Sequence, residues 1–201
     1  MDSYDLIHLR MLAGSISSYQ ELYTNIIRYV RDLKHGTGLL LTYFSRHLKP
    51  DYGWMEHVEI DFTPKCDDGS LPRNAALMDW SHQLMNATEK AYKPMAYNTG
   101  TRDMLQHAGF VEVTEEVIRI PFHPWPSDPH QKDIGRWFIL GLFQGLEALT
   151  LGPLTRVLGR NREDVEKLVA EVKREICTKK YHVFCEMHIW TARRPANATK
   201  K

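Results

Sequence analysis

The segment from Tyr4 to Leu12 constrains the fold most, because it is a short apolar run that contains a histidine and an arginine. A buried parallel strand is normally a nearly continuous apolar run. His8 and Arg10 are two positions apart, so on a strand both side chains project from the same face. Small and polar residues follow at once. The segment is therefore either a buried strand that ends in a ligand-binding loop, or a surface strand with two cationic residues on its wet face.

The rest of the chain alternates between strand and helix patterns. In residues 54–62, Val58 and Ile60 fall on one face while His57, Glu59 and Asp61 fall on the other. Further strands are predicted at 110–120 and 182–192, and helices at 19–33, 74–91, 101–109, 132–151 and 162–176. This order predicts an α/β fold, parallel in its first half, with a helical segment over residues 121–178 inserted before the last strand.

Composition narrows the function classes. Lys and Arg number 26 against 25 Asp and Glu, a formal net charge of +1, so no nucleic-acid or membrane partner is predicted. No apolar run approaches the roughly 20 residues that span a bilayer, and the first residues lack the pattern of a signal peptide. The three cysteines show no CxxC spacing. Reduced thiols in a cytoplasmic or nuclear protein are the simplest interpretation.

Glycines at 135, 141 and 145 interrupt the apolar helix predicted over residues 132–151. Each costs about 1 kcal/mol relative to alanine in a helix interior. We therefore expect another group to approach the helix closely at these positions.

Short motifs along nearly the whole chain resemble the LaeA-like methyltransferases of fungal secondary metabolism, a class I family that depends on S-adenosyl-L-methionine. They are Asp5-Leu6-Ile7-His8-Leu9-Arg10, Leu48-Lys49-Pro50, Gly53-Trp54-Met55-Glu56-His57-Val58-Glu59, Asp67-Asp68-Gly69-Ser70, Ala108-Gly109-Phe110-Val111-Glu112-Val113, Trp125-Pro126-Ser127-Asp128-Pro129, Gly145-Leu146-Glu147-Ala148-Leu149, Thr155-Arg156-Val157-Leu158-Gly159 and Thr191-Ala192-Arg193-Arg194-Pro195.

The resemblance implies a partial class I, Rossmann-like sheet that begins at the family's fourth strand. The family's glycine-rich cofactor turn and its ribose-binding acidic residue would then lie upstream of Met1. On this resemblance, His8, Arg10, Met11 and Leu12 are the candidate cofactor-binding residues for S-adenosyl-L-methionine. The implied function is a methyltransferase of fungal secondary metabolism acting on a small secondary metabolite or a regulatory protein, and activity is not predicted for this chain alone. The alternative is a non-catalytic regulatory or interaction protein.

Candidate substrate-binding residues are Glu59, Trp125 and Trp137. The two tryptophans, with Phe138 and Phe143, are either an aromatic lid over a flat substrate or part of the core. His57, Glu59 and Asp61 are not predicted to bind a metal, because alternate residues spread over about 13 Å of one strand and cannot converge on one ion. No catalytic residue is assigned.

Residues 29–43 interrupt the resemblance and are predicted to be an insertion. The Gly36-Thr37-Gly38 stretch inside it superficially resembles a cofactor-binding turn. A single Gly-x-Gly without a preceding apolar strand is weak support for such a turn.

Overall fold

The computed structural model describes residues 4–27, 48–49 and 52–195. Four strands form one sheet in the order β1-β2-β4-β3, where the strands are β1 (Leu6–Arg10), β2 (Trp54–Lys65), β3 (Val111–Pro121) and β4 (Phe184–Arg193). β1 runs parallel to β2, whereas β4 is antiparallel to both β2 and β3. The parallel character predicted for the first half of the chain and the α/β class are confirmed.

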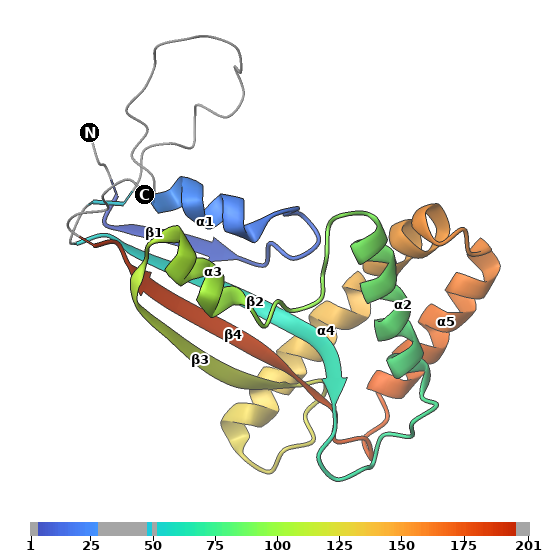
Figure 1. Cartoon of the computed structure of the whole chain (residues 1–201). Coiled ribbons are helices and arrows are strands. Elements are labelled where there is room, and N and C mark those ends of the chain that lie inside the picture. The colour runs from blue at the N-terminus through green and yellow to red at the C-terminus, as the bar shows by residue number, and fades with distance from the viewer. Residues whose placement is uncertain (1–3, 28–47, 50–51, 196–201) are drawn as a thin grey trace.

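The helices cover the sheet in two groups (Figure 1). Helices α1 (Tyr19–Ile27) and α3 (Thr101–Ala108) lie side by side on one face of the sheet, and α3 contacts β3. Helices α2 (Ala76–Lys90), α4 (Pro129–Gly152) and α5 (Arg162–Ile176), with the short π-helix η2 (Pro153–Val157), pack together at the other end. The elements between β3 and β4 are helical, as the sequence predicted for residues 121–178.

Two hydrophobic clusters correspond to these two groups. The smaller lies between α1, α3 and the sheet, around Tyr23, Leu105 and Trp190. The larger joins α2, α4 and α5 to the opposite end of the sheet, and its fully buried members include Trp80 and Leu146. The indole Nε1 of Trp80 donates a hydrogen bond of 2.8 Å to Oγ1 of Thr150, which ties α2 to α4.

Most predicted boundaries agree with the structure to within a few residues. Strand β2 continues past its predicted end, through Pro64, because its pairing with β4 shifts register between Asp61 and Lys65 and no ladder N–H is needed there. Helix α4 begins before its predicted start, since Asp128 accepts a hydrogen bond from the Gln131 amide and proline suits a first helical turn. Helix α1 is described to Ile27, and the predicted insertion at 29–43 lies outside the described residues.

The prediction that another group closely approaches the glycines of α4 is confirmed at Gly135 only. A Cβ added to Gly135 would lie 2.6 Å from the carbonyl oxygen of His123, so the close approach requires glycine. Around Gly141 and Gly145, no described atom apart from the adjacent backbone of α4 itself lies within 4 Å of such a Cβ. At these two positions the prediction of a close contact from within the chain was wrong for the described residues.

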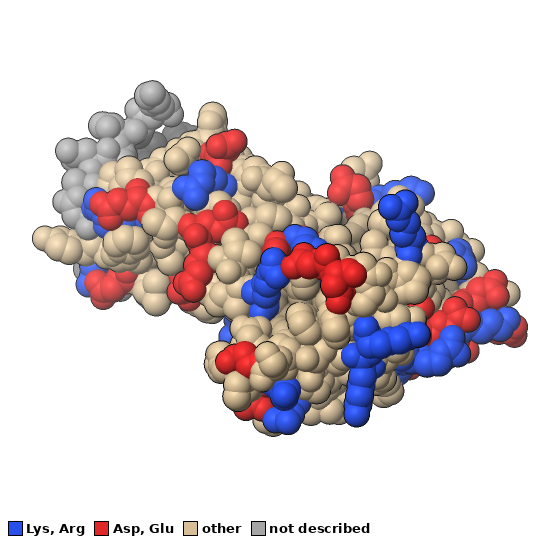
Figure 2. Space-filling view, turned by 90° about the horizontal axis from the view of Figure 1, so that it is seen from below, with Lys and Arg blue, Asp and Glu red and all other residues tan. Residues whose placement is uncertain are grey.

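The segment Pro129–Val157 is a continuous helix of 29 residues, long and apolar enough by length and composition to cross a membrane. The expectation that no apolar run approaches bilayer length was therefore wrong for this segment. One such helix is weak support for a membrane span, because core helices pass the same test. On the face shown in Figure 2, acidic and basic side chains are interspersed with uncharged areas.

Candidate functional site

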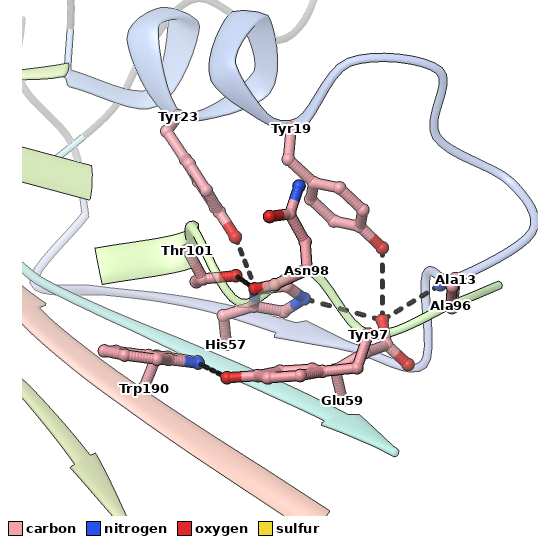
Figure 3. Close-up of a pocket in the computed structure, with 10 residues that line it drawn as sticks. All are labelled: Ala13, Tyr19, Tyr23, His57, Glu59, Ala96, Tyr97, Asn98, Thr101 and Trp190. Carbon is pink, nitrogen blue, oxygen red and sulfur yellow. Dashed lines mark hydrogen bonds and ion pairs between the residues drawn. The ribbon is translucent and has the colours of Figure 1, made fainter. Parts of the chain in front are cut away.

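Glu59 lies in a polar pocket beside the carboxyl end of β1 (Figure 3). Its Oε2 accepts hydrogen bonds of 2.9 Å from the backbone amides of Leu12 and Ala13, and one of 3.2 Å from the Tyr19 hydroxyl. Because Arg10 pairs with Val58 in the parallel ladder, the loop that follows β1 passes directly over Glu59. The carboxylate therefore fixes the conformation of that loop.

The charge state of Glu59 reflects two opposed effects. Burial raises the pKa of its carboxyl group, but the nearby His57 imidazole and the hydrogen bonds from the amides of Ala13 and Leu12 outweigh burial, so the net pKa lies below its ordinary value. Burial and the nearby Glu59 charge also raise the pKa of the Tyr19 hydroxyl. Glu59 is thus an anion at neutral pH, and Tyr19 remains a donor to it.

His57 links Glu59 to helix α1. Its Nδ1 lies 2.8 Å from the Tyr23 hydroxyl, and its Nε2 lies 3.6 Å from Oε2 of Glu59. The second distance is that of an ion pair and is too long for a good hydrogen bond. Accordingly, Nε2 is buried without a hydrogen-bond partner among the described residues. The imidazole is 3% exposed, so its position is set by packing between α1 and the sheet.

A second cluster of polar side chains lies beside Glu59 and His57 on the same face of the sheet. The Tyr97 ring stacks on His188 with ring centroids 3.7 Å apart, and its hydroxyl donates a hydrogen bond of 2.8 Å to Glu115. The same carboxylate oxygen lies 2.8 Å from Nδ1 of His188. The indole of Trp190 donates to the Tyr97 hydroxyl at 3.2 Å. Tyr97 thus closes the pocket on the side opposite Tyr19 (Figure 3).

The space between these side chains is about 10 Å³, which is about enough for one water molecule. Oε2 of Glu59 already accepts three hydrogen bonds. A carboxylate so occupied is poorly placed to take a proton from a substrate. The arrangement is suited to holding the loop after β1, and we assign Glu59 no role as a general base.

The predicted cofactor-binding residues lie on β1 and at the start of the loop that follows it. His8 and Arg10 share the exposed face of β1, and Nδ1 of His8 lies 2.7 Å from Glu56 on β2. Met11 is 42% exposed and has a positive φ of 53°. In the described part of the chain β1 is therefore an exposed edge strand, which agrees with the second interpretation of the Tyr4–Leu12 segment. The cofactor role of these residues stays a prediction.

The two predicted substrate-binding tryptophans lie in different places. Trp125 lines an open groove of about 440 Å³ beside β3, together with Arg119 and Phe184. Its ring stacks on His182 and its indole donates to the Val183 carbonyl. Trp137 is not among the groove residues; it lies on α4 and is 74% exposed. Phe138 packs against Phe122 in the core, so the four aromatic residues form neither a common lid nor a common core.

Sequence comparison decides the relationship of the chain. It is 50% identical over 195 residues to the secondary metabolism regulator LAE1 of Cochliobolus heterostrophus, covering 96% of this chain and 58% of the relative. The chain is LaeA-like in sequence. It is also 36% identical over 194 residues to LaeA of Fusarium oxysporum f. sp. lycopersici, covering 95% of this chain and 56% of the relative. LaeA of Aspergillus fumigatus gives 36% over 195 residues, with 96% and 47% covered.

The resemblance to LaeA-like proteins is thus confirmed, and the LaeA-like chain spans about half the length of the curated relatives it matches. No protein-family model matches it. Among solved structures it is similar to phosphoethanolamine N-methyltransferase 2 of Haemonchus contortus in complex with S-adenosyl-L-methionine, with a TM-score of 0.42 and 15% identity, covering 96% of this chain and 34% of that chain.

Several residues of the polar pocket were not singled out from the LaeA-like sequence. Tyr19 and Tyr23 are four residues apart on a predicted helix, so they share a face, and this spacing was the available signal. Tyr97 lies in an irregular segment with no periodic pattern, and only the tertiary structure brings it over His188. In the described residues, no group of three or more His, Cys, Asp or Glu side chains is arranged to hold a metal ion.

We expect the stability of the LaeA-like chain to fall on acidification through the Glu59 carboxyl. Because its pKa is lower in the folded state than the ordinary 4.5, the stabilisation from Glu59 is fully present above that value and is lost as the pH falls through the folded-state pKa. Urea unfolding of the wild-type chain and of Glu59→Gln, measured between about pH 7 and pH 3, tests this. The difference between the two should shrink with falling pH; a constant difference would contradict it.

Proposed function

We propose that the LaeA-like chain acts in the regulation of secondary metabolism as part of an S-adenosyl-L-methionine-dependent methyltransferase. The observation that carries this proposal is the 50% identity over 195 residues to a secondary metabolism regulator. Because the chain spans 58% of that relative, the activity is proposed for the whole protein to which this segment corresponds.

The described residues do not enclose a cofactor of this size by themselves. Pockets for small molecules and cofactors measure about 300–1,000 Å³, whereas the polar pocket at Glu59 measures about 10 Å³. The groove at Trp125 is larger, about 440 Å³, but it lies beside β3, at the opposite edge of the sheet from β1. We derive no step of methyl transfer from the described residues.

We place the donor beside β1, shared between this chain and segments outside the described residues. Ligands of open α/β sheets bind outside the carboxyl ends of parallel strands. In this chain that position is the loop at Met11, Leu12 and Ala13. Glu59 accepts hydrogen bonds from the amides of Leu12 and Ala13. In this proposal His8, Arg10 and Met11 face the donor, and Glu59 acts on it through the loop.

We propose a small secondary metabolite or a regulatory protein as the acceptor. The open groove lined by Trp125 offers apolar surface and one guanidinium, that of Arg119, for such a ligand. Arg119 is already paired with Asp67 at 2.7 Å. The interspersed charges of Figure 2 and the net charge of +1 support a partner other than nucleic acid. We propose a cytoplasmic or nuclear location and no membrane partner.

Calorimetric titration with S-adenosylhomocysteine tests the proposal on two proteins. One is this chain, and the other is this chain joined to the portion of the Cochliobolus heterostrophus relative that it does not match. We expect the joined protein to bind at least about 10-fold more tightly, equivalent to about 1.4 kcal/mol. Glu59→Gln should weaken binding in the joined protein, and Glu116→Gln, the same change at an exposed position on β3, should not.

Thermal unfolding of the joined protein controls for its folding. A joined protein that melts cooperatively and gives no binding heat at millimolar S-adenosylhomocysteine would overturn the proposal. Tight binding that is unchanged by Glu59→Gln, as it should be by Glu116→Gln at an exposed position on β3, would leave the methyltransferase assignment intact and remove Glu59 from the site.

A further inference from the structure

Helix α4 presents large apolar side chains to solvent along its outer face. Trp137 is 74% exposed, Leu140 is 49% exposed and Phe143 is 41% exposed. The opposite side of the helix is anchored in the core by Leu142 and Leu146, which are 5% and 0% exposed. Contiguous exposed apolar side chains on a folded domain usually mark an interaction surface. We call Arg136, Trp137, Leu140, Phe143 and Glu147 the outer face of α4.

The charges of the outer face are arranged for a second copy of the same helix. Arg136 and Glu147 are exposed and eleven residues apart, so they lie three turns from each other on one flank of α4. Within the helix Arg136 is paired with Asp133 at 2.5 Å, an exposed ion pair that can be exchanged for one with a second copy because such pairs contribute little to stability. If a second α4 packs antiparallel, with the two-fold axis between residues 141 and 142, Arg136 of each copy lies opposite Glu147 of the other. The same register places Leu140 beside Phe143. One register therefore pairs the charged residues and brings Leu140 against Phe143, and Trp137 lies at the side of this contact.

We propose that two copies of this chain associate through the outer faces of their α4 helices, antiparallel, with two Arg136–Glu147 ion pairs. A lipid surface fits less well, because Asp133, Arg136, Gln144 and Glu147 are all exposed on the same helix, and charged groups are expensive inside a bilayer. The inference is independent of the proposed methyltransferase activity, since neither β1 nor the pocket at Glu59 takes part in it.

Sedimentation velocity over a concentration series of the full chain tests the pairing. We expect a monomer–dimer equilibrium in the wild type. Arg136→Glu or Glu147→Arg places like charges opposite each other twice, and each should weaken dimerisation at least about 10-fold. The double variant Arg136→Glu/Glu147→Arg restores opposite charges across the two-fold axis and should recover dimerisation. Glu89→Arg, an exposed charge reversal on α2, is the matched control and should change nothing.

Circular dichroism melts of each variant separate loss of pairing from loss of folding. A wild-type chain that stays monomeric up to about 100 µM, a concentration at which a micromolar dimer would be nearly fully formed, overturns the proposal. A dimer that is indifferent to both single charge reversals overturns the register. A monomer that instead sediments with phosphatidylcholine–phosphatidylserine vesicles would assign the outer face to a membrane and overturn the pairing.

Discussion

Replacing Trp80 with alanine is expected to lower the free energy of unfolding by about 3–5 kcal/mol. The indole lies on α2, is completely buried in the larger hydrophobic cluster and donates a hydrogen bond to Thr150 on α4. The substitution removes its apolar contacts, leaves a cavity, and takes the donor away from Thr150, which is also 0% exposed. Urea denaturation followed by far-UV circular dichroism measures the change.

Two further variants show which part of the Trp80 effect is packing. Trp80→Phe keeps most of the ring but loses the hydrogen bond to Thr150, and should cost about 1–2 kcal/mol. Tyr52→Ala truncates an aromatic side chain that is 76% exposed, and should change the free energy by less than about 0.5 kcal/mol. If Trp80→Ala were as mild as Tyr52→Ala, the described burial of Trp80 in the larger cluster would be wrong.

Replacing Glu59 with alanine is expected to cost about 3 kcal/mol of unfolding free energy. The carboxylate is 5% exposed and is the shared acceptor for the amides of Leu12 and Ala13 and for the Tyr19 hydroxyl. Its removal leaves these donors without their partner and frees the loop after β1. Hydrogen exchange should show faster exchange at the amides of Leu12 and Ala13 before the rest of the sheet opens.

Glu56 offers the control for Glu59 on the same strand. Its carboxylate pairs with His8 at 2.7 Å, but both side chains are largely exposed, at 37% and 44%. Exposed ion pairs contribute about 0–1 kcal/mol. Glu56→Ala should therefore change stability little and leave exchange at Leu12 and Ala13 unchanged. Equal effects of the two substitutions would show that Glu59 does not fix the loop.

Local sequence signals identified most of the secondary structure. The alternation in β2 placed His57, Glu59 and Asp61 on one face, and all three are buried there. Gly109, the last residue of the helix predicted at 101–109, ends that helix with a left-handed φ of 105°. Asn161 directly precedes the helix predicted at 162–176, and its side chain accepts a hydrogen bond from the Glu163 amide. Caps and face alternation depend on neighbours within a few residues, which the sequence records directly.

The candidate site could be predicted only in part, because its members come from distant segments. Glu59 was identified as a candidate from its strand face and the resemblance, but its partners Leu12 and Tyr19 lie 47 and 40 residues away in the sequence. Nothing in the local pattern of Tyr97 indicates that it stacks on His188. Trp125 lies between two prolines and Trp137 lies in an apolar helix, and neither local pattern indicates that the first lines a groove while the second is exposed on α4.

The sequence by itself determined the α/β class, the order and approximate limits of the elements, and the relationship to LaeA-like regulators. These depend on residue periodicity, capping and short motifs, which are properties of contiguous stretches. Only the tertiary structure decided that Glu59 anchors the loop after β1 and that α4 exposes an apolar face. Both depend on contacts between segments that are distant in the sequence. The parallel pairing of β1 with β2 brings the loop over Glu59, and the packing of one side of α4 on the core leaves its other side exposed.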